Sequence, residues 1–192
     1  MIKGEDLKRL INFSDAIVAV AITLLVIPLT DLFQNFSGDN LLHVFTSIEF
    51  SAKFSSFLIS FFVIYSVWET HRKLFSGINE INIAVAKYNR LWLLCTVLIP
   101  AATMVNIGYS NNLGIYIYGL ILIINILLLQ IIKKRVGQVS TTFEHTTLQI
   151  LILCLILLTI FPNLGHGVYY LLIFDASINR LKKWMITKKK AS

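Results

Sequence analysis

Long uncharged apolar runs constrain the fold of this chain more than any other feature of its sequence. Residues 91–109 and 113–132 contain no charged side chain, and about 20 apolar residues are enough for a helix to cross the hydrocarbon core of a bilayer. In hydrocarbon every backbone N–H and C=O must be paired within the protein, which an isolated strand cannot achieve. The sequence therefore predicts an all-α integral membrane protein.

Composition supports this class and excludes a water-soluble enzyme. The chain of 192 residues is 56% hydrophobic and 14% charged, whereas soluble domains are about 45–50% apolar and about 25% charged. Six spans leave room only for loops and tails, so we expect a single membrane domain over residues 1–192. The predicted spans are approximately residues 10–33, 50–70, 89–109, 113–132, 146–162 and 166–181.

The distribution of basic residues predicts the orientation in the membrane. With six spans, every one of the 17 Lys and Arg residues except Lys53 falls on one side, and Asp31, Asp39 and Glu49 cluster on the other. By the positive-inside rule both termini are cytoplasmic and the protein is a multi-pass protein of the cell membrane. The net charge of +7 thus reflects topology, and no nucleic-acid partner is expected. The basic tail Lys188–Lys190 fits a topology anchor better than a lipid site.

Catalytic and metal-binding patterns are absent from the sequence. There is no HExxH, GxSxG, P-loop or GxGxxG string, so we expect no enzyme activity, no cofactor and no fixed metal site. A carbonyl filter of the TVGYG type is also excluded, because the nearest string, Asn106–Ser110, lacks the threonine and the second glycine. The histidines lack close metal-ligand spacing; they are His43, His71, His145 and His166.

The first span has an apolar face. At about 100° per residue, five of its apolar side chains fall within one narrow sector: Phe13, Ile17, Val20, Leu24 and Ile27. Ala16, Ala19 and Thr23 form a flanking stripe of small residues that permits close helix approach. This spacing also fits an ordinary helix that turns its apolar face toward lipid.

Ser14 and Asp15 point away from that face, toward neighbouring helices. An aspartate near the membrane interior is costly unless it is paired. We expect Arg9, His71 or Asn89 to be its partner.

Several residues resemble the pattern of the transmembrane protein 175 family, the potassium channels of endosomes and lysosomes and their bacterial relatives. The resemblance begins with Arg9, the string Phe13-Ser14-Asp15 and Thr23. Trp68 and His71, followed by Leu74-Phe75, are similar to the family's W-x-x-H segment, and Asn89 and Pro100 resemble further positions of the family pattern. A single six-span unit resembles the bacterial branch.

The resemblance implies a homotetramer in which the first helix of each subunit lines a pore for monovalent cations. Val20 matches the constriction position, which is commonly isoleucine in the family, and Leu24 and Ile27 match the next apolar layers. Thr23 matches a threonine layer implicated in cation preference, so permeant K⁺ is expected near it. The expected function is a potassium-permeable cation channel with a hydrophobic side-chain constriction instead of a carbonyl filter.

The same resemblance assigns a second group of residues to an interhelical polar network that positions the first helix. These residues are Arg9, Phe13, Ser14, Asp15, Trp68, His71 and Asn89.

Two other functions stay open. A secondary transporter needs binding groups near the middle of the membrane and usually has broken helices, whereas Pro28, Pro100 and Pro162 lie near span ends and Asp175 is an isolated acidic residue. A non-conducting scaffold subunit is also compatible with the sequence.

Overall fold

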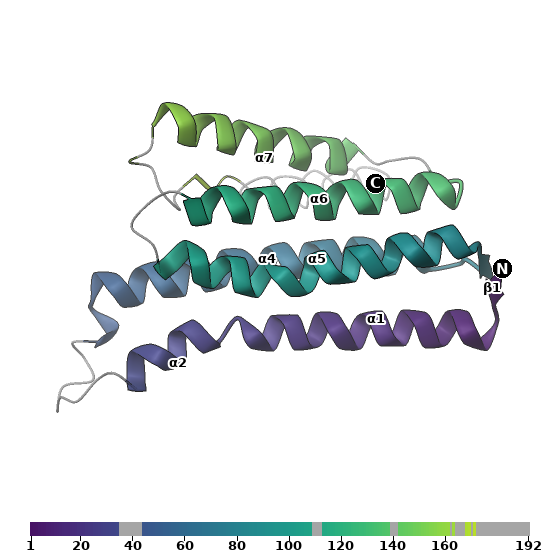
Figure 1. The fold of residues 1–192 in the computed structure, drawn as a ribbon, viewed down its shortest axis with the longest axis horizontal. Helices are drawn as coiled ribbons and strands as arrows, with labels where there is room; N and C mark the ends of the chain where they lie inside the picture. Colours follow the sequence, from purple (N-terminus) through teal and green to yellow (C-terminus); the bar gives the residue numbers. More distant parts are fainter. Residues whose placement is uncertain are drawn as a thin grey trace, which may run out of the picture.

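The computed structural model describes residues 1–34, 44–108, 113–138 and 142–161, together with residues 163, 168, 169 and 171. These residues are mostly helical, and Figure 1 shows the helices running along a common long axis. The elements are β1 (Ile2–Lys3), α1 (Glu5–Leu24), α2 (Ile27–Gln34), α4 (Ile48–Phe75), β2 (Glu80–Ile81), α5 (Ile83–Gly108), α6 (Leu113–Arg135) and α7 (Thr142–Ile160).

Helix length and hydropathy support several membrane crossings. Four helical segments are long and apolar enough to span a bilayer: Glu5–Asp31, Ile48–Phe75, Ile83–Val105 and Leu113–Arg135. A shorter apolar segment, Thr147–Ile160, lies within α7. The predicted helical, multi-pass membrane class is thus confirmed. The sixth predicted span, 166–181, lies outside the described residues except for three positions, so the six-span topology and the cytoplasmic termini stay predictions.

The first predicted span is two helices rather than one. Pro28 has no backbone N–H and its ring disfavours a continuing helix, so α1 ends at Leu24 and α2 begins at Ile27. Around this break the Leu25 and Val26 amides donate to carbonyls three residues earlier, at 3.3 and 3.2 Å. The hydrogen-bond spacing therefore falls from four residues to three, and the chain makes a tighter helical turn before α2 starts.

The third predicted span also starts earlier than residue 89. α5 begins at Ile83 because Asn82 caps it, with the Asn82 Oδ1 accepting a hydrogen bond from the Val85 amide at 2.8 Å. Asparagine is among the preferred residues at this position.

α6 ends in a Schellman motif. Gln138 N donates to Lys133 O, and Gly137, at φ +78°, takes the left-handed conformation.

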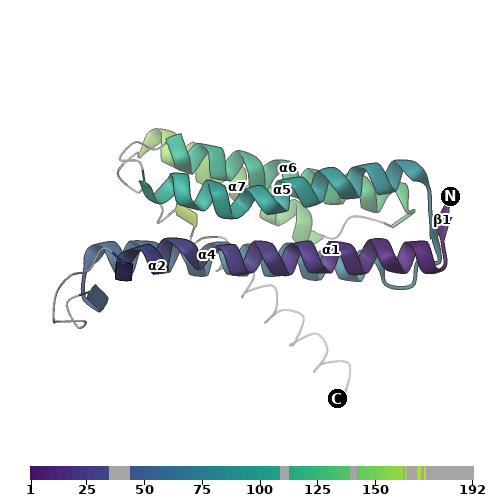
Figure 2. The same ribbon diagram turned by 60° about the horizontal axis from the view of Figure 1, so that its bottom comes forward.

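The helices form a bundle in which α5 is central. Figure 1 shows α1 and α2 along one edge and α7 along the other, with α4, α5 and α6 between them. Figure 2 shows the same bundle with α1 and α4 on one side and α5, α6 and α7 on the other. Side chains such as Trp92, Ile99 and Leu122 are fully buried in the core.

The start of the chain is tied to the connection between α4 and α5. β1 and β2 pair antiparallel, with Ile2 opposite Ile81 and Lys3 opposite Glu80. Gly4 then turns the chain into α1 at φ +60° and ψ −127°, a backbone conformation available essentially to glycine. The first residues of α1 thus have a defined position at this end of the bundle.

Gly119 allows α6 to pack closely, and its enlargement should destabilise the fold. A Cβ at Gly119 would lie 2.5 Å from the Tyr169 hydroxyl and 2.7 Å from Leu155 Cδ2, while that hydroxyl is held by a 2.7 Å bond to Ile115 O. We expect Gly119→Val to lower the free energy of unfolding by about 1–3 kcal/mol, measured by denaturation in detergent. Ala101→Val, at an exposed position of α5, is the control. Equal stability of the two variants would contradict the close packing at Gly119.

Candidate functional site

A buried chain of hydrogen bonds joins α4 and α5 to α1. The His71 imidazole of α4 contacts Asn89 of α5 through Nε2 and Oδ1 at 2.7 Å. Asn89 Nδ2 donates to Ser14 Oγ of α1 at 3.0 Å, and Ser14 Oγ donates to Leu10 O at 2.8 Å. His71, Asn89 and Ser14 are each at most 1% exposed, so all three helices are joined without help from solvent.

The bond from Ser14 to the Leu10 carbonyl determines which atom is the donor and which the acceptor in the other bonds. Because the Ser14 hydroxyl proton goes to a backbone carbonyl, its oxygen must accept from Asn89, and the Asn89 carbonyl therefore faces His71. The His71 Nε2 must then carry a proton and donate it. His71 Nδ1 is buried and has no hydrogen-bond partner among the described residues.

Two aromatic rings contact His71. The Trp92 ring of α5 stacks on the imidazole at a centroid distance of 4.1 Å and an interplanar angle of 6°. The Phe75 ring lies 4.7 Å away on α4. The imidazole is thus held both by stacking on Trp92 and by its hydrogen bond to Asn89.

Asp15 has a different partner from the ones expected. Its Oδ1 accepts a 2.7 Å hydrogen bond from the Trp68 indole N–H of α4, whereas His71 and Asn89 pair with each other. Arg9 lies six residues before Asp15 in the chain, and its guanidinium is 4.0 Å from Glu5 instead. Among the described residues, the side-chain hydrogen bond at Asp15 thus comes from Trp68 and not from Arg9, His71 or Asn89, although His71 lies near enough to interact with the carboxylate electrostatically.

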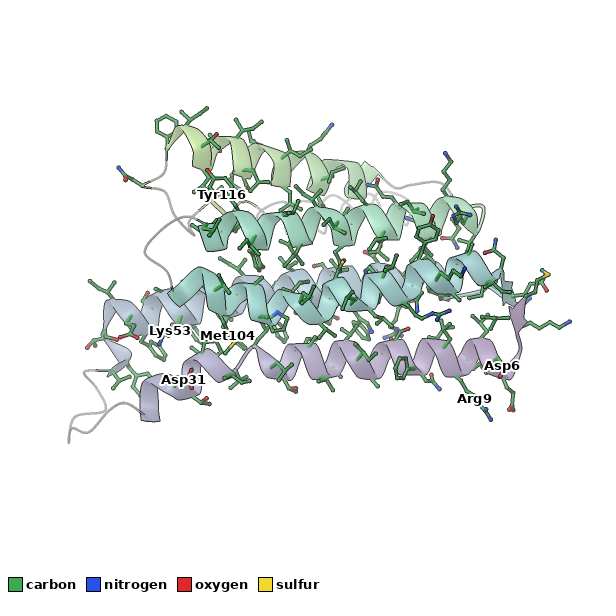
Figure 3. All side chains as sticks on the ribbon, in the orientation of Figure 1. Asp6, Arg9, Asp31, Lys53, Met104 and Tyr116 are labelled. Carbon is green, nitrogen blue, oxygen red and sulfur yellow. The ribbon has the colours of Figure 1, made fainter. Side chains whose placement is uncertain are left out.

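The structure thus brings together five residues of the predicted network and leaves two apart. Ser14, Asp15, Trp68, His71 and Asn89 form two hydrogen-bonded contacts between α1 and its neighbours. Arg9 is exposed at the start of α1 (Figure 3). Phe13 is 62% exposed and lies away from the buried side of α1.

Sequence reasoning missed an extension of this network toward α6. Trp92 Nε1 donates to Asn125 Oδ1 at 3.0 Å, and Asn125 Nδ2 donates to Thr96 Oγ1 at 2.9 Å. Asn125 is fully buried. An asparagine inside the uncharged run 113–132 is the signal that could have revealed it, because a buried amide in a membrane helix needs a partner.

The opposite side of α1 is uncovered in the single chain. Leu7, Ser14, Val18 and Ala21 are the buried residues of this helix. The four residues predicted to line a pore are all exposed: Val20 at 55%, Leu24 at 37%, Ile27 at 39%, and Thr23. Ile27 belongs to α2, beyond the break at residues 25–26.

Thr23 presents an oxygen on this exposed side. Its hydroxyl donates to Val20 O at 2.7 Å. The hydroxyl proton is thus held by the backbone, and the oxygen lone pairs are available to a cation or to water.

Other chemistry receives no support from the described residues. Within residues 1–34, 44–108, 113–138 and 142–161, no group of three or more His, Cys, Asp or Glu side chains is placed to hold a metal ion. Asp175, the isolated acidic residue considered for a secondary transporter, lies outside the described residues. The permeant K⁺ expected near Thr23 stays a prediction.

Comparison with known proteins supports the resemblance read from the sequence. The family model described as "Endosomal/lysosomal potassium channel TMEM175" matches residues 9–100, which include most of α1, all of α2 and α4 and most of α5. A crystal structure described as a lysosomal potassium-selective channel TMEM175 homolog from Chamaesiphon minutus has the same fold. It matches with a TM-score of 0.66 and 20% identity over 90% of this chain and 97% of that one. A search of curated proteins found no match.

Asn89 should be the most sensitive member of the buried chain. Asn89→Ala removes the acceptor of His71 and the donor to Ser14, so it leaves buried polar groups unsatisfied at a cost of about 1–3 kcal/mol each. We expect the free energy of unfolding to fall by about 3 kcal/mol, measured by chemical denaturation in detergent. Asn12→Ala, at an exposed position of α1, should change it little. A similar small effect at Asn89 would show that the chain contributes nothing to stability.

Proposed function

We propose that this chain, whose residues 9–100 match the TMEM175 family model, is a subunit of a potassium-permeable cation channel. The observation that carries the proposal is this match, because it covers α1 together with the helices that anchor it. The printed description of the structural relative, a potassium-selective channel, points the same way.

The conducting path in this proposal is lined by α1. Hydrogen bonds of Ser14 and Asp15 hold one side of the helix against α4 and α5, which leaves Val20, Thr23 and Leu24 facing outward. One copy of α1 cannot enclose a pore, so several chains must surround a common axis. The family resemblance supplies the number four. Exposed Ala16 and Ala19 are small enough to let neighbouring subunits approach closely.

Selectivity and gating then depend on side chains. Rings of Val20 and Leu24 lie one helical turn apart, about 6 Å along the axis, and a narrow apolar ring blocks ions by excluding water. Thr23 hydroxyl oxygens lie between these two layers and can stabilise a partly hydrated cation. Since no cage of carbonyls replaces the hydration shell, we expect modest preference for K⁺ over Na⁺.

The basic test is ion flux from proteoliposomes that contain the purified protein. K⁺ flux exceeding Na⁺ flux, without flux of a large organic cation, supports the channel. Flux that saturates and requires a second ion gradient favours a secondary transporter. Absence of flux from folded, tetrameric protein, in the wild type and in a variant with a hydrated constriction, favours a scaffold subunit.

Val20→Asn supplies that variant. A polar ring retains water where valine excludes it, so we expect K⁺ flux to increase several-fold over wild type. Val97→Asn makes the same substitution at an exposed position of α5 and serves as the matched control. Unchanged flux in Val20→Asn, or an equal rise in the control, would remove Val20 from the conducting path.

Thr23→Val tests the oxygen layer, because valine has almost the same shape as threonine but no hydroxyl. Loss of one weak polar contact to the permeant ion should reduce the K⁺-to-Na⁺ permeability ratio by a factor of about 3. Reversal potentials in bi-ionic conditions measure this ratio. Thr159→Val, an exposed threonine of α7 with the same local hydroxyl-to-carbonyl bond, is the control, and an equal change in both variants would argue against a specific role of Thr23.

A further inference from the structure

A concentration of positive charge lies where α5 begins and α6 ends. Figure 1 places this end of the two helices beside the N-terminus. Lys87 and Arg90 of α5 and Lys134 and Arg135 of α6 are all exposed. We call these four residues the α5–α6 basic patch.

No carboxylate of α5 or α6 neutralises the patch, because neither helix contains Asp or Glu. The salt bridges observed among the described residues involve other cations, namely Arg9, Lys53 and Lys73. The four charges of the patch therefore lie at the same end of two neighbouring helices, and the salt bridges of the described residues include none of them.

Arg135 is held in place by Tyr88 of α5. Its guanidinium carbon lies 4.8 Å from the centre of the Tyr88 ring, and Nη2 donates to the Tyr88 hydroxyl at 3.4 Å. A guanidinium fixed on an aromatic ring loses less conformational freedom when it binds an anion, and its remaining N–H groups match the geometry of a phosphate.

Membrane topology and helix dipoles explain only part of this arrangement. Lys134 and Arg135 lie at the negative end of the α6 dipole and are favoured there. Lys87 and Arg90 lie in the first two turns of α5, near the positive end of its dipole, where no such stabilisation exists. Topology requires a number of charges on one side, but it does not require an arginine of one helix to be held on an aromatic ring of the next, as Arg135 is on Tyr88.

We propose that the α5–α6 basic patch binds the phosphate of an anionic phospholipid. Both helices are long and apolar enough to cross the bilayer, so their charged ends lie at the depth of the headgroups. Arg135 forms paired hydrogen bonds with the phosphate, and Lys87, Arg90 and Lys134 supply further positive charge. The lipid chains lie along the exposed apolar residues of α5 and α6, such as Leu91, Leu94 and Ile131. This inference does not depend on ion conduction.

The experiment compares anionic and zwitterionic lipid added to the purified full-length protein in detergent. Phosphatidylglycerol should raise the midpoint of thermal unfolding by about 4 °C over the same amount of phosphatidylcholine. Native mass spectrometry should retain bound phosphatidylglycerol. The difference between the two lipids should shrink in high salt because the attraction is screened.

Charge-removing variants locate the site. Arg135→Gln and Lys134→Gln should each lose at least half of the phosphatidylglycerol effect; Lys134 is exposed, so its replacement tests the site even if the Arg135 variant folds poorly. Lys53→Gln removes one positive charge from the opposite end of the bundle and should keep the full effect. Equal stabilisation by both lipids, an undiminished effect in both patch variants, or the same stabilisation by inorganic phosphate alone would overturn the proposal.

Discussion

The orientation of α1 about its own axis depends on the Ser14 hydroxyl. This hydroxyl is buried where α1 meets α4 and α5, and it both donates and accepts a hydrogen bond. It accepts from Asn89 and donates to Leu10 O. In a bilayer no water is available to replace either bond, so turning α1 by even one residue would leave buried polar groups unpaired. The Trp68–Asp15 bond, one residue further along, opposes the same rotation. The side of α1 that stays uncovered is thus determined by the side that is bonded.

The bonded side is itself supported by a deeper layer. His71 is stacked on Trp92, and Trp92 is bonded to Asn125 of α6. α6 is among the most apolar helices of the chain and packs closely against α5. Contacts through α4 and α5 therefore connect α1 to α6, which is the most buried of the four candidate spans. α1, at the edge of the bundle, is therefore connected to the core by a continuous series of side-chain contacts.

Much of this arrangement was accessible from the sequence, because polar residues are rare in apolar runs and stand out there. Ser14, His71 and Asn89 are such residues, and the resemblance to the family pattern assigned them to one network. Their pairing was not accessible, since Asp15 had three plausible charged or polar partners and its actual partner, Trp68, offers a single N–H that periodicity does not reveal. Trp92 was missed because an aromatic residue in an apolar helix resembles ordinary core. The break before Pro28 was also missed, because hydropathy is insensitive to a lost backbone donor.

That break has a mechanical consequence. Hydrogen bonds at Ser14 and Asp15 hold α1 against α5 and α4, whereas Ile27 belongs to α2, a separate short helix. In the proposed pore, the rings of Val20 and Leu24 thus stand on α1, and the ring of Ile27 stands on a different helix. A tilt of α2 about residues 25–26 would then change the width of the Ile27 ring independently of the Val20 and Leu24 rings.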